Sequence, residues 1–256
     1  MNNELTNISE TPKKSIRLSK KDILYLAIIG ALVVAVAVSL FFLMRDRNRG
    51  DDISYYDQKC NMFALENANL AHGQIVFIGD SITDGCALDN YYSALPCATY
   101  NRGIGGDTTA GVLARLKTSL FDVKPAKIVL MIGINDINGG VETATILDHY
   151  NEILTQIKKE LPNTQVFCVS ILPVNNVLES YTLVNVAKTT ERILEINPEI
   201  EKLAVKHGYE FVNLFDEFAD EGQRLYQELS PDGIHLNDAG YQKYSTLLIP
   251  HLKDTE

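Results

Sequence analysis

The sequence has no internal repeat with a period of roughly 20 to 50 residues, and it has neither a proline-rich nor a serine-rich tract. The missing repeat excludes solenoids, and the missing low-complexity tracts argue against a disordered chain. A chain of 256 residues can build one substantial domain with a real core, or two small ones. We therefore expect one compact unit.

Cysteine is scarce, and its four residues fit neither a CxxC pattern nor a Cys/His spacing typical of zinc sites. Cys168 lies in an apolar run that reads as strand core, and Cys60 lies in a segment with helical spacing. Cys86 and Cys97 flank one loop, and outside the cytoplasm they could pair, adding about 2 to 3 kcal/mol. The spacing leaves this pairing open and predicts no metal site.

Basic charge is scarce beyond the N-terminus. The net charge is −10, and residues 1–44 hold five Lys or Arg against three acids, so the remainder sums to −12. Such a surface repels phosphate backbones. We therefore expect no nucleic-acid partner.

Charge is absent altogether from residues 23–44, which read ILYLAIIGALVVAVAVSLFFLM. At about 1.5 Å per residue, a helix of this length spans the roughly 30 Å core of a bilayer. A cleaved signal peptide is the alternative, since AVAVS offers small residues, but the run exceeds the roughly 7 to 15 apolar residues of a signal peptide. We therefore expect an uncleaved transmembrane anchor.

The charges on either side of this segment predict its orientation. Five Lys or Arg precede it and three Arg follow it closely, an excess that keeps the N-terminus in the cytoplasm. The predicted organisation is a cytoplasmic tail over residues 1–22, an anchor over 23–44, a charged linker over 45–53 and a folded domain over 54–256. We expect a single-pass protein of the cell membrane with its folded domain on the extracytoplasmic side.

Within the folded domain, apolar runs alternate with segments of helical spacing. The expected strands are residues 75–78, 98–102, 128–132, 166–171 and 209–214, and the expected helices are 54–70, 108–121, 142–160, 184–207 and 238–252. Near-continuous apolar strands separated by helices imply a parallel sheet covered on both faces. We predict a three-layer α/β/α, flavodoxin-like sandwich around a mostly parallel five-stranded sheet, and ligands gather at the carboxyl ends of such strands.

The loop after the first expected strand reads GDSITDG. Gly79 permits a sharp exit from the strand, and Ser81 comes where a helical turn would begin, close to amide N–H groups. A hydroxyl there is exposed at the positive end of a helix dipole. The plainer interpretation is that Ser81 only caps that helix.

The next two loops offer hydrogen-bond donors. NRGIGGDTTAGVLARL holds glycines whose N–H groups, at Gly105 or Gly106, could donate to an anion, and Asp107 is expected to cap the helix from residue 108. A nucleotide-binding loop is the alternative, but neither GxxxxGK[ST] nor GxGxxG is present. In IGINDI, Asn135 offers a carboxamide N–H, although Asn135 and Asp136 could equally form a simple turn.

Near the C-terminus, LSPDGIHLNDAGYQKY sets Asp232 three residues before His235. Both side chains then lie on one side of a turn, where the acid can fix the imidazole tautomer and the other ring nitrogen can face a serine. The other histidines lie in or beside helices without such a context and are interpreted as solvated or packing residues: His72, His149, His207 and His251.

The blocks GDSITDG, NRGIGGDT, GIND and DGIH occur in this order over residues 75–244. Their combination resembles the SGNH hydrolases, also called GDSL esterases and lipases. Ile82 stands where the family name has Leu, a change of similar volume. The GxSxG elbow of the standard α/β-hydrolases is missing, which argues against that fold.

The resemblance implies a role for each matching residue. Ser81 would be the nucleophile and its N–H the first oxyanion donor, Gly106 the second donor and Asn135 the third. Asp232 and His235 would complete the triad. The resemblance implies no cofactor and no metal.

The function implied is a serine-dependent carboxylic ester hydrolase acting on short-acyl, chiefly acetyl, esters of glycans or small molecules. A lysophospholipase or lipase acting beside its membrane is the nearest alternative. A catalytically silent binding domain is a third possibility. A fourth is a phosphoesterase whose Mg²⁺ is held by some of five carboxylates, Asp80, Asp84, Asp107, Asp136 and Asp232.

Overall fold

The computed structural model describes residues 19, 21, 36, 54–175 and 185–253. One compact unit runs from Ile53 to Glu256. The predicted anchor over residues 23–44 lies, apart from Val36, outside the described residues. Among the helices that the structure does describe, none combines the length and apolar character needed to cross a bilayer.

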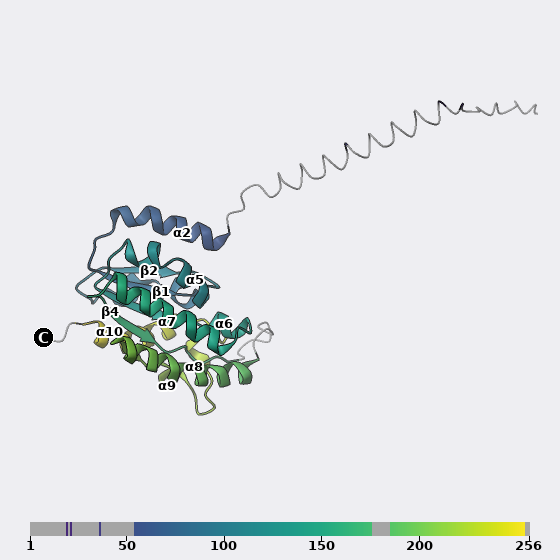
Figure 1. The fold of residues 1–256 in the computed structure, drawn as a ribbon. Coiled ribbons are helices and arrows are strands. Elements are labelled where there is room, and N and C mark those ends of the chain that lie inside the picture. The colour runs from purple at the N-terminus through teal and green to yellow at the C-terminus, as the bar shows by residue number, and fades with distance from the viewer. Residues whose placement is uncertain (1–18, 20, 22–35, 37–53, 176–184, 254–256) are drawn as a thin grey trace, which may run out of the picture. The chain divides into compact units, whose positions relative to one another are not determined.

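The centre of the domain is a five-stranded sheet with the order β2-β1-β3-β4-β5 (Figure 1). Every neighbouring pair is parallel. The strands are β1 (Ile75–Gly79), β2 (Thr99–Gly103), β3 (Lys127–Met131), β4 (Gln165–Val169) and β5 (Glu210–Val212). The predicted parallel five-stranded sheet is therefore confirmed, and strand order reverses at β1, where open α/β sheets bind ligands.

Helices cover both faces of this sheet. The longer ones are α2 (Tyr55–Glu66), α5 (Thr109–Ala114), α7 (Thr143–Glu160), α8 (Val186–His207) and α10 (Asp238–Leu252). The short ones are α3 (Ser81–Asp84), α4 (Leu88–Tyr92), α6 (Ile134–Asn138), α9 (Phe215–Phe218), and the turns η1 (Asn67–Asn69), η2 (Lys117–Phe121) and η3 (Gln227–Leu229). Figure 1 shows α7 and α8 packed together on one side of the sheet.

Successive strand residues point to opposite faces, and this alternation divides the core in two. Val76 and Ile78 pack with α5, α7 and α8 on one face. Ile75 and Phe77 pack with α4, α9 and α10 on the other. The result is the predicted three-layer sandwich.

Two local expectations were wrong. The helix expected over residues 108–121 ends at Ala114, and the π-type turn η2 follows it. At the break, the Arg115 side chain points into the protein interior and donates to the carbonyl oxygens of Arg102 and Gly79. Thr108, not Asp107, caps α5 by accepting the N–H of Gly111. The pairing left open between Cys86 and Cys97 does not form, since both thiols are free.

Candidate active site

Ser81 is the first residue of α3, directly after β1. The cap of this helix is Asp80, whose Oδ1 accepts the Ile82 N–H at 3.0 Å. The interpretation of Ser81 as a helix cap is therefore wrong. Because Asp80 satisfies the helix end, the Ser81 hydroxyl is left to make a tertiary contact.

That contact is with His235, 154 residues further along the chain. His235 Nε2 lies 2.9 Å from Ser81 Oγ, and His235 Nδ1 lies 2.6 Å from Asp232 Oδ2. The structure thus places all three predicted residues in one line of hydrogen bonds. This arrangement can pass the serine proton to an imidazole whose other nitrogen is held by a carboxylate.

The turn that holds Asp232 and His235 is built from local hydrogen bonds. Asp232 Oδ1 accepts the N–H groups of Ile234 and His235, at 2.9 and 2.8 Å. Gly233 between them has a φ of +88°, and a Cβ there would lie 1.8 Å from the Asn175 carbonyl oxygen. Only glycine fits this position, which explains the sequence DGIH.

These hydrogen bonds also set the ionisation of Asp232. Burial alone raises the pKa of its carboxyl, but hydrogen bonds from the His235 ring and from the N–H groups of His235 and Ile234 outweigh it, and the pKa falls below its ordinary value. The carboxylate is therefore charged at neutral pH. A charged carboxylate at this position favours the imidazole tautomer that carries its proton on Nδ1.

Asp80 behaves in the opposite way. Its side chain is buried, and burial raises the pKa of its carboxyl to about 7 although the Ile82 N–H opposes the shift. The pKa of Asp80 is therefore higher in the folded chain than in the unfolded one. The contribution of its protonated carboxyl to the stability of the fold is fully present below about pH 4 and is lost as the pH rises through about 7. Asp80 is thus part-protonated near neutral pH.

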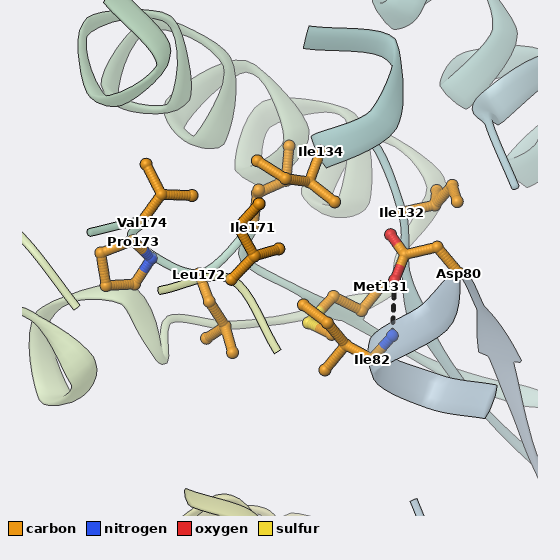
Figure 2. Close-up of a pocket in the computed structure, with 10 residues that line it drawn as sticks. Asp80, Ile82, Met131, Ile132, Ile134, Ile171, Leu172, Pro173 and Val174 are labelled. Atoms are coloured by element: carbon orange, nitrogen blue, oxygen red, sulfur yellow. Dashed lines mark hydrogen bonds between the residues drawn. The ribbon is translucent and has the colours of Figure 1, made fainter. Parts of the chain in front are cut away.

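Figure 2 shows Asp80 at the edge of an apolar cavity, with Ile82 close to its carboxylate and Ile171 and Leu172 further away. The cavity between them has a volume of about 10 Å³ and is also lined by Ile234, the residue before His235. A space of that size holds roughly one water-sized group.

Of the other two predicted oxyanion donors, Gly106 lies in the loop after β2 and Asn135 lies in α6, which follows β3. Gly106 is exposed with a φ of +79°, and its N–H donates no hydrogen bond to any residue that the structure describes. Asn135 Nδ2 donates to the carbonyl oxygen of Asp107 at 2.8 Å, which sets its carboxamide beside the Gly106 loop. A carboxamide carries two N–H hydrogens, so one remains for a ligand.

A buried ion pair that the sequence analysis missed supports this loop. Arg115 Nε donates to Asp107 Oδ2 at 2.8 Å, and both side chains are only 2% exposed. The same guanidinium donates to the carbonyl oxygens of Arg102 and Gly79, and so joins the ends of β1 and β2. Removing one partner of such a pair typically costs about 3 to 5 kcal/mol. The feature of the sequence that could have indicated this ion pair is the arginine inside the otherwise apolar stretch GVLARL.

Each of the five acids considered as magnesium ligands has a different hydrogen-bond partner. Their partners are the Ile82 N–H for Asp80, Lys59 for Asp84, Arg115 for Asp107, Thr109 for Asp136 and His235 for Asp232. Within the described part of the chain, no three His, Cys, Asp or Glu residues are grouped so as to hold a metal ion. The carboxylates therefore do not form the cluster that the phosphoesterase hypothesis needs.

The remaining histidines contact other parts of the molecule. His149 Nδ1 lies 3.2 Å from Thr109 Oγ1, His207 Nε2 lies 3.0 Å from Asn151 Oδ1, and His251 contacts Glu210. Of the histidines, His235 is the one bonded to Ser81.

Comparisons with known proteins identify the family of this chain. The model of the GDSL-like lipase/acylhydrolase family matches residues 77–243. A Streptococcus pneumonia protein, described provisionally as a platelet activating factor, superposes with a TM-score of 0.72 at 30% identity, over 86% of this chain and 99% of that one. A GDSL-like lipase from Bacteroides thetaiotaomicron shares the fold, with a TM-score of 0.67 at 22% identity, over 78% of this chain and 98% of that one.

Among curated proteins, the platelet-activating factor acetylhydrolase IB subunit alpha2 of Rattus norvegicus is 31% identical over 135 residues. This match covers 49% of this chain and 54% of the relative. The chain thus spans about half the length of the curated relatives it matches.

Proposed function

The chain belongs to the GDSL-like lipase/acylhydrolase family, and we propose that it hydrolyses carboxylic esters with Ser81 as nucleophile, His235 as general base and Asp232 as its partner. Membership of an acylhydrolase family implies an ester hydrolase. The observation that carries the proposal is the unbroken line of hydrogen bonds from Ser81 Oγ through the His235 ring to Asp232.

The proposed reaction has two halves. Ser81 Oγ attacks the ester carbonyl carbon while its proton moves to His235 Nε2, and Asp232 stabilises the imidazolium that forms. His235 then returns the proton to the departing alcohol, which leaves an acyl group on Ser81. Water, deprotonated by His235, attacks that acyl group, and His235 returns the proton to Ser81 Oγ as the bond to the acyl group breaks and the acid leaves.

Negative charge grows on the former carbonyl oxygen in each half. We assign its stabilisation to the N–H groups of Ser81 and Gly106 and to the second N–H of the Asn135 carboxamide. Donors held in place before the reaction stabilise this charge without reorganising, and each is typically worth about 3 to 4 kcal/mol. The hydrogen bond from Asn135 to Asp107 supports the assignment, because it orients the carboxamide beside the Gly106 loop.

The substrates proposed are esters of short acyl groups, chiefly acetyl esters of glycans or small molecules. The support is that the curated relative is named for acetyl hydrolysis. A lysophospholipase or lipase that acts near the membrane is the alternative, which a long-chain preference would favour.

A panel of esters tests the function. We expect kcat/KM to fall from acetyl to butyryl to long-chain esters, and a fluorophosphonate to abolish hydrolysis by reacting with Ser81, whereas EDTA should have no effect. The measurement is the rate of ester hydrolysis with mass spectrometry of the labelled protein. Loss of activity in EDTA together with resistance to fluorophosphonate would instead support the metal-dependent phosphoesterase, and an unlabelled, inactive protein would support the binding domain.

We also propose that residues 23–44 anchor the chain in the cell membrane, with residues 54–256 on the extracytoplasmic side. The support is the run of 22 uncharged residues and the basic residues before it. The expected result is full-length protein in the membrane fraction that resists carbonate washing, together with cleavage of the domain by protease added to intact spheroplasts. Release by carbonate would contradict the anchor. Protection of the domain from that protease would contradict its orientation.

A further inference from the structure

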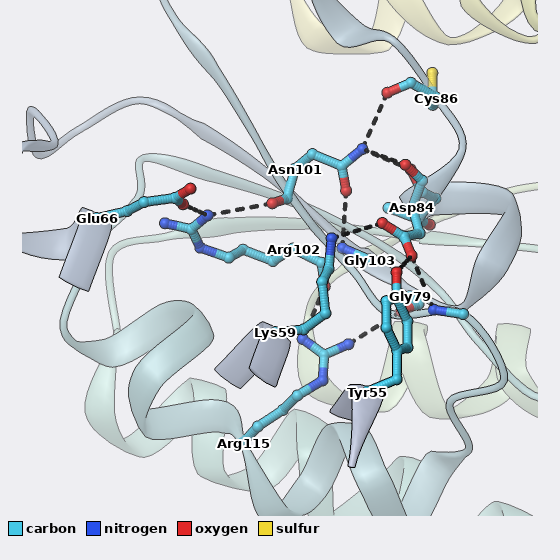
Figure 3. A network of polar contacts seen from close by, with 12 residues as sticks. Tyr55, Lys59, Glu66, Gly79, Asp84, Cys86, Asn101, Arg102, Gly103 and Arg115 are labelled. Carbon is cyan, nitrogen blue, oxygen red and sulfur yellow. Dashed lines mark hydrogen bonds and ion pairs between the residues drawn. The ribbon is translucent and has the colours of Figure 1, made fainter. Parts of the chain in front are cut away.

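Asp84, the last residue of α3, joins three segments of the chain. Its Oδ1 accepts from Lys59 Nζ at 2.7 Å, and its Oδ2 accepts from the Tyr55 hydroxyl at 2.5 Å and from the Gly105 N–H at 3.0 Å. Figure 3 shows Tyr55 and Lys59 reaching Asp84 from one side. The side chains of Lys59 and Asp84 are only 19% and 18% exposed.

Tyr55 and Lys59 come from α2, which lies before the segment matched by the family model, residues 77–243. They stand four residues apart, so they share one face of the helix. The Tyr55 ring also lies over the glycine loop, since a Cβ built on Gly105 would come within 3.6 Å of its Cε1.

The backbone around Asp84 is held independently of its carboxylate. Asn101 Nδ2 donates to the carbonyl oxygens of Thr83 and Cys86, and Asn101 Oδ1 accepts the Gly103 N–H (Figure 3). These contacts tie α3 to the end of β2. The backbone at Asp84 is therefore held by Asn101, and the Asp84 carboxylate adds the hydrogen bond to the Gly105 N–H.

Gly105 precedes Gly106, the proposed second oxyanion donor, in a loop with glycine at positions 103, 105 and 106. Glycine loses more conformational freedom on ordering than any other residue. Such a loop therefore needs contacts on both sides of Gly106 if the Gly106 N–H is to be held in place before the reaction. The Asp107–Arg115 pair anchors the loop after Gly106. The Asp84 carboxylate anchors it before Gly106.

Resting on the proposed function, we propose that Asp84, Tyr55 and Lys59 are positioning residues that hold the Gly105–Gly106 segment so that the Gly106 N–H meets the oxyanion. Lys59 has a second effect. A bare carboxylate near the loop would oppose a growing negative charge, and the ammonium of Lys59 offsets it. The pKa of Tyr55 is raised to about 12, first by its hydrogen bond to Asp84, so its hydroxyl remains a donor at any working pH.

The test compares Asp84→Ala, Lys59→Met and Tyr55→Phe with the wild-type chain. Active sites are counted with a fluorophosphonate, so that kcat per site is independent of the folded fraction. We expect kcat per site to fall about 10- to 100-fold in Asp84→Ala and less in the other two, below the effect of deleting a donor outright, with KM within about twofold. The inhibition constant of a trifluoromethyl ketone, which forms a tetrahedral adduct, should rise in the same proportion.

The matched control is Lys117→Met, which breaks a Lys–Asp pair of similar length, 2.6 Å, away from the site. It should leave kcat and the inhibition constant unchanged. Tyr55→Phe removes one hydroxyl and keeps the ring, so this variant can test the proposal if Asp84→Ala does not fold. Amide exchange of the Gly105 segment, which needs no esterase activity, should be faster in Asp84→Ala.

The proposal is overturned if kcat per site and the inhibition constant stay within about twofold of wild type in the folded variants, or if only the melting temperature changes. Unchanged amide exchange of the Gly105 segment would overturn it as well. Failure of the proposed function is a different result, because a wild-type chain that neither hydrolyses esters nor reacts with fluorophosphonate shows it before any variant is made.

Discussion

Replacing Ser81 by Ala is expected to abolish hydrolysis of a chromogenic acetyl ester, with kcat/KM lower by at least about 10⁴-fold. The variant loses the only atom that can form the proposed acyl-enzyme, whereas the N–H at position 81 remains. The circular dichroism spectrum and the melting temperature should stay as in wild type, because Asp80, not Ser81, caps α3. Ester hydrolysis and thermal melting are the measurements.

Ser93→Ala is the matched control for this experiment. Ser93 is exposed at the C-terminal end of α4, so its hydroxyl should matter neither to hydrolysis nor to labelling. Retained hydrolysis in Ser81→Ala, at a rate close to that of Ser93→Ala, would contradict the assignment of the nucleophile. Fluorophosphonate labelling that persists in Ser81→Ala would do the same.

Replacing Asp232 by Asn is expected to lower kcat by about 10⁴-fold, with little change in KM. A carboxamide can offer an N–H to Nδ1, which favours the tautomer with its proton on Nε2 and leaves no base for Ser81. It also removes the charge that stabilises the imidazolium. Steady-state kinetics with the acetyl ester measures the effect, and a decrease of less than about tenfold would contradict the role of Asp232.

The same variant makes a prediction about pH. The pKa of Asp232 is lower in the folded chain than its ordinary value, so the charged carboxylate stabilises the fold above about pH 4, and this contribution is lost as the pH falls further. Urea unfolding should therefore show wild type more stable than Asp232→Asn at neutral pH, with the difference shrinking below about pH 4. A difference that grows as the pH falls would show that the pKa shift has the opposite sign.

Much of this molecule was predictable from the sequence because the signals are local. Apolar runs such as residues 128–132 predict strands by period and composition, and all five expected strands occur within a few residues of the predicted positions. The candidate residues Ser81, Gly106 and Asn135 each follow a strand, and parallel strands bring their carboxyl ends to one edge. The order of the four motifs was enough to indicate the family.

Other features depended on partners distant in the chain. Asp107 was expected to cap a helix, but a buried guanidinium eight residues away binds it instead. Asp84 was considered as a metal ligand, whereas it holds Gly105 with the help of Tyr55 and Lys59, which precede it by 29 and 25 residues. No local pattern encodes which donor a carboxylate will meet.

The sequence by itself determined the alternation of strands and helices, the glycine turns and the types of side chain available at the sheet edge. Only the tertiary structure decided that His235 stands 2.9 Å from Ser81 and that a helix near residue 55 supports the loop of the proposed oxyanion donor. The physical reason is range. Backbone preferences and hydrophobic periodicity act over a few residues, but a hydrogen bond forms between whichever groups the packed layers bring within about 3 Å.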